Sequence, residues 1–285
     1  MVRLKTAIIT EKGLRISNED NIANTKLAKR AYFLSVADGM GGTAGGEIAS
    51  KSVLISITEF LKKEIKDRRL TLKELLEKSF LVGQTCLADK ISAKPSLNGM
   101  GTTLTAVLIK DGKYVWGNLG DSRIYLMSDG NMRLLTRDHS YIQDYIKNYN
   151  QNVSDQIISK YRNIVTKIID GGVDKPDIFP QSTDYETLNR GDLFLICSDG
   201  LIIDKTKDYT SIFETILRKN KSLKKTAKEL IRWALDNGSD DNISVVLGQF
   251  GNLKKRKQSL EDENTIRILT KGKSESGTST ESTDQ

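Results

Sequence analysis

The sequence predicts an α+β domain with antiparallel sheets, and three observations support this fold class. Apolar and β-branched runs of strand length recur along the chain. Two Asp-Gly pairs separate such runs by two residues, which is the usual signal of a tight hairpin. Amphipathic helical segments lie apart from the strands without regular strand–helix alternation, and this order favours antiparallel over parallel pairing.

The predicted strands are rich in Val, Ile, Leu, Tyr and Phe, which suit a pleated, buried surface. Asp111-Gly112 joins LTAVLIK to KYVWGNL, and Asp129-Gly130 joins RIYLM to NMRLL, so these segments are expected to form an antiparallel meander. The strands are predicted at residues 4–10, 32–37, 102–109, 114–119, 124–127, 193–197 and 243–250.

Three amphipathic segments are predicted as helices, at residues 48–66, 72–92 and 223–235. The first two are long and joined by a short polar link, so they are expected to cover one sheet face together. Residues 141–160 are more polar and are predicted as a helical, mobile insertion. The last predicted strand ends near Phe250, and the Ser/Thr/Gly/Glu-rich composition beyond it predicts a flexible tail at 252–285.

The bulk composition is that of one globular domain with a sizeable core. The chain has 285 residues, of which 38% are apolar and 28% charged. The net charge of +7 and the pI of about 9.1 raise the question of an anionic partner. However, Lys and Arg are interleaved with Asp and Glu, and no long basic run with aromatic residues occurs. We therefore expect a monomer with no nucleic-acid partner and no stable membrane anchor.

Cysteine use and hydropathy predict a cytoplasmic location. Cys86 and Cys197 are far apart in sequence and suggest neither a disulfide framework nor a zinc cluster. The first ten residues, MVRLKTAIIT, lack the features of a signal peptide. No apolar run approaches the ~18 residues that a membrane span needs.

Two further Asp-Gly pairs do not fit the hairpin pattern. Asp38-Gly39 and Asp199-Gly200 each follow an apolar run, YFLSVAD and LFLICSD, and neither is followed directly by a strand. A carboxylate at the end of a buried strand is unfavourable unless it is paired or binds a metal. The glycines allow the backbone to approach another group closely.

Other acidic residues extend this pattern, which favours a metal site with oxygen ligands. Asp121 follows VWGNLG, Asp241 precedes ISVVLGQF, and Asp20 lies in the polar run SNEDN. The chain has a single histidine, His139, so a metal held here would be magnesium or manganese rather than zinc. Read from these residues alone, a metal-dependent hydrolase and a plain α+β domain stay equally open.

Seven segments in a fixed order carry a specific resemblance. They are RISNED (15–20), VADGMGGTAGGEIAS (36–50), GMGTTLTAVLI (99–109), GNLGDSRIYL (117–126), LTRDHS (135–140), LFLICSDGL (193–201) and GSDDNISVVL (238–247). Together they resemble the bacterial PP2C-like, metal-dependent protein phosphatases of the PPM family, over residues 3–250. The resemblance implies a four-layer α-β-β-α sandwich of two antiparallel sheets flanked by helices, in a phosphatase domain at residues 1–251.

The resemblance also implies an activity and a cofactor. The expected reaction is hydrolysis of phosphoserine and phosphothreonine on proteins, by water activated between two Mn²⁺ or Mg²⁺ ions, in opposition to a bacterial Ser/Thr kinase. Asp38 matches the carboxylate that bridges both ions, and the Gly39 carbonyl matches a second contact to one of them. Asp199 and Asp241 match ligands of the other ion.

Four further assignments follow from the same resemblance. Glu19 and Asp20 match acidic residues that hold the metal or its bound waters. Asp121, together with Asp199, matches the site of a third ion in bacterial members. Arg15 matches the phosphate-binding arginine. The intact set of carboxylates argues against a pseudophosphatase, which would bind phosphoproteins without hydrolysing them.

Three positions near the motifs are interpreted differently. Met40 stands where some members carry a histidine proposed as general acid, so the leaving-group proton is expected from elsewhere. Asp240 is expected to be a solvated neighbour of the ligand Asp241. His139 is the only histidine, and a structural hydrogen-bonding role is predicted for it.

Two variable segments complete the prediction. Residues 140–185 correspond to the variable flap beside the cleft of the family. The basic run at 254–257 is interpreted as a solvated cluster. Thr265, which follows acidic residues in EDENTIRIL, resembles a phosphothreonine site read by forkhead-associated domains, although a plain Ser/Thr-rich tail is the simpler interpretation.

Overall fold

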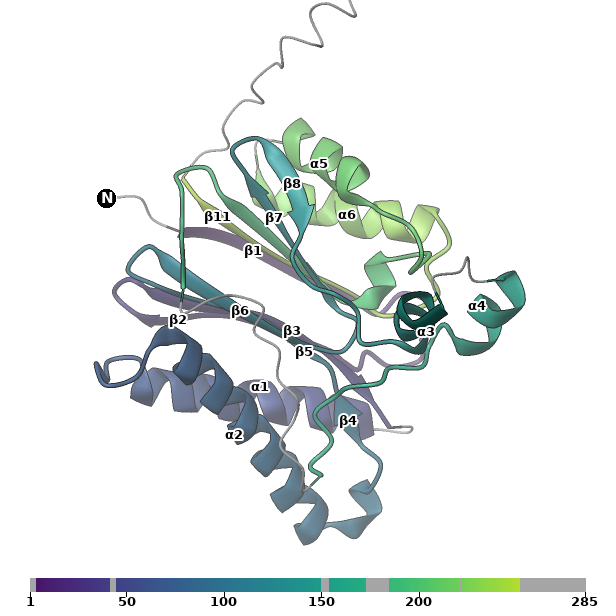
Figure 1. The fold of residues 1–285 in the computed structure, drawn as a ribbon, viewed down its shortest axis with the longest axis horizontal. Coiled ribbons are helices and arrows are strands. Elements are labelled where there is room, and N and C mark those ends of the chain that lie inside the picture. The colour runs from purple at the N-terminus through teal and green to yellow at the C-terminus, as the bar shows by residue number, and fades with distance from the viewer. Residues whose placement is uncertain (1–3, 42–44, 150–153, 173–184, 221, 252–285) are drawn as a thin grey trace, which may run out of the picture.

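Two antiparallel sheets lie face to face, and a pair of helices covers the outer face of each (Figure 1). The structure is a computed structural model that describes residues 4–41, 45–149, 154–172, 185–220 and 222–251. The four-layer α-β-β-α sandwich that the sequence predicted is confirmed. The predicted tail, including Thr265, lies outside the described residues.

The first sheet brings together segments that are distant in sequence. All of its strands pair antiparallel, and the first and last strands of the domain are neighbours, with Leu4 opposite Phe250. In spatial order the strands are β1 (Leu4–Glu11), β11 (Ile243–Phe250), β10 (Leu193–Cys197), β7 (Arg123–Ser128) and β8 (Asn131–Leu134).

The second sheet is built from the N-terminal half of the chain and one short later strand. In spatial order its strands are β2 (Asp20–Ala28), β3 (Ala31–Met40), β5 (Leu104–Lys110), β6 (Lys113–Leu119) and β9 (Glu186–Thr187), and β4 (Gly101–Thr102) pairs with the end of β3. The predicted hairpins are confirmed. Asp111 and Asp129 have φ values of 53° and 49°, and the glycine after each is also left-handed, as a two-residue turn requires.

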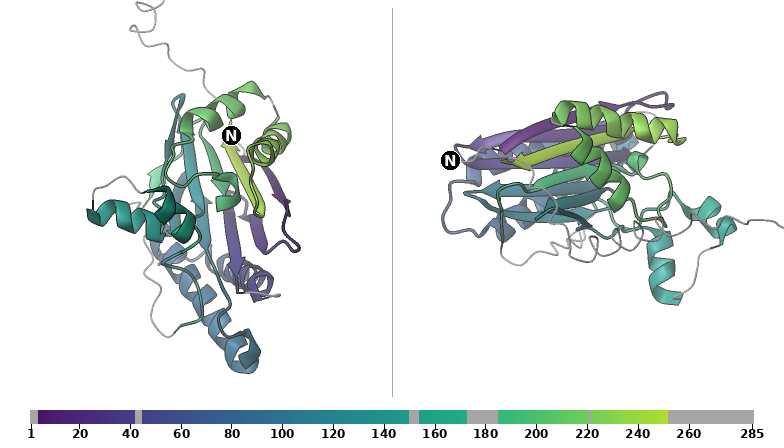
Figure 2. Two further views of the ribbon diagram at one scale, coloured as in Figure 1. Left: turned by 90° about the vertical axis from the view of Figure 1, so that its right-hand side faces the viewer. Right: turned by 90° about the horizontal axis from the view of Figure 1, so that it is seen from above.

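The outer layers are two helix pairs. α1 (Gly45–Glu64) and α2 (Leu72–Ala93) cover the second sheet, and α5 (Thr210–Lys219) and α6 (Leu223–Asp236) cover the first (Figures 1 and 2). α2 begins with a capping box, in which the Thr71 side chain accepts from the Glu74 N–H while the Glu74 carboxylate accepts from the Thr71 N–H. Among the described residues, no helix has both the length and the apolar character that crossing a bilayer requires.

The central strands are largely apolar because both of their faces are buried. On β3, Phe33 packs against α1 and α2, while Leu34 points into the layer between the sheets. On β10, Leu195 packs against α5 and α6, while Ile196 points between the sheets. The core therefore consists of three apolar layers, one between the sheets and one beneath each helix pair.

Two elements that form full parts of the sandwich were missed from the sequence. β2 lies at a sheet edge and mixes polar and apolar residues, so it lacks the continuous apolar run of the central strands. α5 is only 10 residues long, although Phe213, Ile216 and Leu217 have helical spacing. The predicted helical insertion forms two helices, α3 (Tyr141–Tyr149) and α4 (Asp155–Tyr161), with residues 150–153 outside the described part.

A buried ion pair joins β7 to the segment that follows β8. Arg123 Nε lies 2.8 Å from Asp138 Oδ1, and Arg123 Nη2 lies 2.7 Å from Asp138 Oδ2. Both side chains are almost fully buried, at 4% and 2% exposure. Their parallel hydrogen bonds satisfy both charges, so removing one partner would leave the other buried and uncompensated.

We predict that Arg123→Gln lowers the free energy of unfolding by roughly 3–5 kcal/mol, since Asp138 would then be buried without a counter-charge. Arg30→Gln is the matched control, because Arg30 and Asp111 form an ion pair about half exposed to solvent. It should cost less than about 1 kcal/mol. Urea unfolding followed by circular dichroism measures both, and equal effects would contradict the predicted importance of the buried pair.

Candidate active site

Four aspartates meet at one edge of the sandwich because each lies at or beside the end of a central or paired strand. Asp20 begins β2, and it lies directly opposite Asp38 near the end of β3. Asp199 begins a short 3₁₀ turn immediately after β10. Asp241 lies two residues before β11. Strand pairing brings Asp20 beside Asp38, and the face-to-face packing of the two sheets brings them close to Asp199 and Asp241.

Three of these acids, Asp38, Asp199 and Asp241, line a cleft with a volume of about 580 Å³. Asp20 is not part of the lining and is 4% exposed, with its Oδ2 accepting a 2.7 Å hydrogen bond from the Ser198 hydroxyl. All other residues predicted for the site line the cleft, namely Arg15, Glu19, Asp38, Gly39, Asp121, Asp199 and Asp241. Met40 and Asn163 also line it.

The backbone around Asp38 is fixed by two threonines. The Asp38 N–H donates to the Thr103 hydroxyl at 2.9 Å, and the Thr103 N–H donates to the Asp38 carbonyl at 2.8 Å. The Thr102 hydroxyl donates to the same carbonyl at 2.9 Å. The Asp38 carboxyl is therefore held on a rigid strand end, which suits a central ligand.

Asn242 connects two loops of the site, a role that the sequence reasoning missed. Its Oδ1 accepts from the Glu19 N–H at 2.8 Å, and its Nδ2 donates to the carbonyls of Lys12 and Ser17 at 2.8 and 2.9 Å. These bonds fix the loop that carries Arg15 against the loop that carries Asp241. The sequence feature that could have indicated this role is its position directly after the candidate ligand Asp241 in GSDDN.

Burial and mutual repulsion strongly perturb the acids. Burial raises the pKa of Asp20 to about 8, and the charges of Asp199 and Asp241 act in the same direction. Burial, followed by the charge of Asp20, raises the pKa of Asp38 well above its usual range. Burial and the charge of Asp199 also raise the pKa of Asp241. The cluster thus favours fewer negative charges than it has carboxyl groups, unless cations bind.

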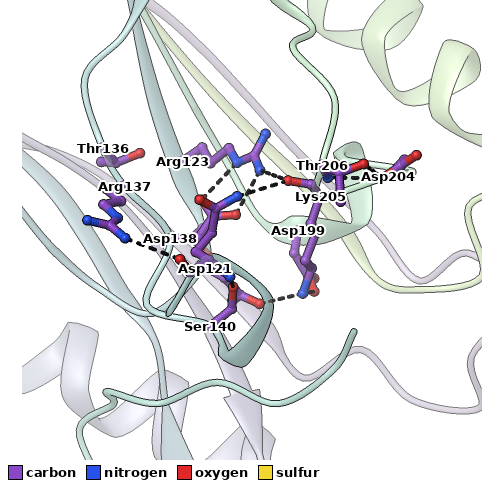
Figure 3. Close-up of polar contacts among 12 residues, drawn as sticks. Asp121, Arg123, Thr136, Arg137, Asp138, Ser140, Asp199, Asp204, Lys205 and Thr206 are labelled. Atoms are coloured by element: carbon purple, nitrogen blue, oxygen red, sulfur yellow. Dashed lines mark hydrogen bonds and ion pairs between the residues drawn. The ribbon is translucent and has the colours of Figure 1, made fainter. Parts of the chain in front are cut away.

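Lys205 supplies one cation within the cluster (Figure 3). Its Nζ lies 2.5 Å from Asp121 Oδ2 and 2.8 Å from Asp199 Oδ2. Burial and the charge of Asp199 raise the pKa of Asp121 to about 6, although Lys205 opposes the shift. Burial alone would raise the pKa of Asp199, but Lys205 outweighs it and the pKa is lowered. No pattern in the sequence indicated this lysine.

The residues present fit hard divalent cations. Asp20 Oδ1, Asp121 Oδ1 and Asp199 Oδ1 are buried and make no hydrogen bond to the residues that the structure describes. Such oxygens are costly to bury unless a cation binds them, and carboxylate oxygens are the ligands that Mg²⁺ and Mn²⁺ prefer. In their present positions, no three Asp, Glu, His or Cys side chains of the described residues form a complete ligand set. The buried unpaired oxygens and the raised pKa values nevertheless identify where positive charge is needed.

Arg15 lies at the rim of the cleft and is oriented by the loop before β11. Its Nη2 binds Asp241 Oδ2 at 2.8 Å, and its Nε donates to the Asp240 carbonyl at 3.0 Å. The side chain is half exposed, so an incoming anion can reach it. The Asp240 carboxylate instead pairs with Arg162 at 3.0 Å and is well exposed, consistent with its predicted place outside the ligand set.

His139 has the structural role that was predicted for it. Its ring Nδ1 accepts a 3.2 Å hydrogen bond from the Gly120 backbone N–H, and the backbone N–H of His139 donates to the Gly120 carbonyl at 2.9 Å. These bonds fix the backbone next to Asp121.

A second pocket of about 280 Å³ adjoins the cleft and shares Asp199 and Asp241 with it. The insertion contributes Ile142 from α3, Ile158 from α4 and Arg162 to its lining. The predicted flap segment therefore borders the site. This adjacent groove is a suitable place for the residues that flank a reacting group.

Comparisons with known proteins cover nearly the whole described domain. A family model described as protein phosphatase 2C matches residues 14–247. The chain is 32% identical over 247 residues to the serine/threonine protein phosphatase PstP of Mycobacterium tuberculosis, a match covering 86% of this chain and 44% of that protein. It is 30% identical over 244 residues to the serine/threonine phosphatase stp of Listeria welshimeri, covering 84% of this chain and 92% of that protein.

The chain thus spans less than half the length of the mycobacterial relative that it matches. Among solved structures, a similar one is the catalytic domain of PstP in complex with two manganese ions. The TM-score is 0.72 at 27% identity, and the match covers 88% of this chain and 100% of that one. The range matched by the family model, residues 14–247, spans every acid of the cleft.

We predict that the metal-free protein loses stability as the pH rises from about 4 to about 8. The unfolded chain releases the Asp20 proton near its ordinary pKa of 3.8, whereas the folded chain retains it up to about 8. Between these values the folded state binds more protons, so the free energy of unfolding falls with rising pH. Asp20→Asn should make this dependence shallower. Denaturant unfolding at several pH values measures it.

The exposed Asp240 provides the control for this experiment, because Asp240→Asn should leave the slope unchanged. Stability that rises with pH over the same range would show that protein groups already compensate the buried acids.

Gly46 offers a test of the close packing around Glu19. A Cβ at Gly46 would overlap the Glu19 carboxylate and the Gly39 backbone, whereas a Cβ at neighbouring Gly45 would make only ordinary contact with Met100. We predict that Gly46→Ala weakens Mn²⁺ binding at least ~10-fold, in the range found when groups that orient ligands are displaced. Gly45→Ala should bind Mn²⁺ as the wild type does, as measured by calorimetric titration. Equal affinities for the two variants would contradict the prediction.

Proposed function

This chain belongs to the protein phosphatase 2C family, and we propose that it hydrolyses phosphoserine and phosphothreonine on proteins in a binuclear metal centre. The observation that carries the proposal is the convergence of Asp38, Asp199 and Asp241 in one cleft, with Asp20 paired opposite Asp38 and Arg15 at the rim. The two manganese ions in the solved structure of a relative support the same conclusion.

Each acid has a role in holding the ions. Asp38, which is close enough to the other acids for their charges to raise its pKa, would be the central ligand. The Gly39 carbonyl, Asp199 and Asp241 would be further ligands of the ions. Glu19 and Asp20 would hold the ions directly or through water. The oxygen-only donor set suits Mn²⁺ or Mg²⁺.

When bound, two such ions lower the pKa of water between them and neutralise the oxygens of a phosphate group. Arg15 binds the phosphate at the cleft rim, where its pairing with Asp241 fixes the orientation of the guanidinium plane. Met40 cannot donate a proton to the leaving serine or threonine oxygen, and His139 is bonded to the Gly120 backbone. Neither Met40 nor His139 is therefore assigned as the proton donor, and we propose water for this role.

We also propose the class of substrate and partner. The adjoining pocket beside α3 and α4 is suited to the residues that flank a phosphorylated side chain. The substrates are proteins phosphorylated by a bacterial Ser/Thr kinase in the cytoplasm, with the kinase itself among the candidates. A forkhead-associated domain that reads phosphorylated Thr265 stays a prediction, as does the monomeric state.

We predict that the purified protein releases phosphate from a phosphothreonine peptide and from an aryl phosphate with Mn²⁺ or Mg²⁺, and that EDTA abolishes release. Asp38→Asn and Asp199→Asn should each lower kcat/KM by more than ~100-fold, since a ligand contributes more than the 10- to 100-fold typical of outer-shell groups. Asp240→Asn is the matched control, because this exposed neighbour should keep activity within a few-fold of wild type. Phosphate release by a malachite-green assay gives all the values.

Folded wild-type protein that binds phosphopeptide but releases no phosphate with any divalent metal would favour a pseudophosphatase instead. Activity that survives EDTA would argue against the binuclear centre itself.

A further inference from the structure

The buried ammonium of Lys205 lies at the position that the sequence assigned to a third metal ion. Its two partners, Asp121 and Asp199, are the carboxylates predicted to hold that ion. The Lys205 side chain is 10% exposed, and Asp121 is 1% exposed, so little water reaches the pair. Figure 3 shows the lysine reaching across from the loop after the 3₁₀ turn to both acids.

The backbone of Lys205 is anchored within the same buried network. Its carbonyl accepts hydrogen bonds from Arg123 Nη2 at 3.2 Å and from Gln143 Nε2 at 3.3 Å. Arg123 is itself fixed by its two bonds to Asp138. The lysine is therefore aimed at the acids by a packed polar network, unlike a flexible surface ion pair.

The residues on either side of Lys205 hold the loop in shape. The Asp204 N–H donates to the Tyr209 hydroxyl at 2.9 Å, and the Thr206 N–H donates to Asp204 Oδ1 at 2.9 Å. Lys207, two residues further on, points outward and pairs with Asp204 at 69% exposure. Only one of the two lysines of this loop is therefore directed at the buried acids.

A divalent ion and the ammonium cannot share these oxygens. An ion held by Asp121 and Asp199 must contact their carboxylate oxygens directly, and the lysine already binds Oδ2 of both. A metal that bound the remaining oxygens of both acids would lie within a few ångströms of the ammonium. The two positive charges would then repel with little solvent screening.

We propose that Lys205 replaces the third metal ion, so that this chain binds two divalent ions and not three. The proposal rests on the binuclear centre proposed above. Asp199 then has two roles: its Oδ2 binds Lys205, while its buried Oδ1, which makes no hydrogen bond within the described residues, is left for the metal pair. Asp121 is the partner of the lysine rather than a metal ligand, and Lys205 is a positioning residue for Asp199.

The number of bound ions tests this proposal directly. Metal-free wild type, Lys205→Met and Lys207→Met would be titrated with Mn²⁺ by calorimetry, with metal content checked by elemental analysis after gel filtration. We expect two ions in the wild type and in Lys207→Met. Lys205→Met keeps the apolar stem but lacks the charge, so it should bind a third ion at least tenfold more tightly than the wild type does.

Three ions in the wild type, bound as tightly as in Lys205→Met, would overturn the proposal while leaving the binuclear centre intact. Two ions in both would also overturn it, because the lysine would then not be what excludes the third. A wild type that binds no ion would overturn the proposed function itself, which keeps the two failures distinct.

A second variant covers the case in which Lys205→Met does not fold. Asp121→Asn in the wild-type background should still bind two ions, because Asp121 serves the lysine. The loss of one ion in Asp121→Asn would show that Asp121 is a metal ligand and would overturn the proposal.

Discussion

The structure depends on one electrostatic constraint: several aspartates are buried together, where their charges repel and water cannot screen them. Asp20 and Asp38 lie directly opposite on adjacent strands, an arrangement that is unfavourable for like charges in an ordinary sheet. The protein holds them there with a rigid surrounding frame. Thr103 fixes the backbone of Asp38, and Asn242 joins the two loops that flank the cleft. The stability of three apolar layers thus supports a region that, without cations, opposes folding.

Much of this frame was predictable because central strands buried on both faces are continuous apolar runs. β10 and β11 have the predicted bounds, and α2 and α6 differ from prediction by one residue at most. β2 was missed because an edge strand has one partly solvated face, which breaks the apolar run. α5 was missed because its ten residues give too short a periodic signal. Both omissions concern peripheral elements, where burial and hence the sequence pattern are weaker.

The candidate site was predictable to a similar degree, and its limits have a physical cause. Asp38 and Asp199 stand out because an acid after an apolar run needs an explanation, and the ordered motifs add Arg15 and Asp241. The contributions of Asn242 and Lys205 depend on contacts between distant loops, which no local pattern reveals. Lys205 in particular is one of two lysines in DKTKD, and only the folded loop distinguishes it from Lys207.

The double-sided burial of β10 has a consequence for how the chain finds its alignment during folding. Because Leu195 and Ile196 face two apolar layers, a shift of the strand register by one residue would bury nearly the same apolar surface. The hydrophobic pattern alone therefore cannot choose between the alternatives. The choice is made at the strand end, where the Ser198 hydroxyl reaches both the Ser244 N–H and Asp20. The polar groups at the edge that carries the candidate active site thus determine the register of this strand.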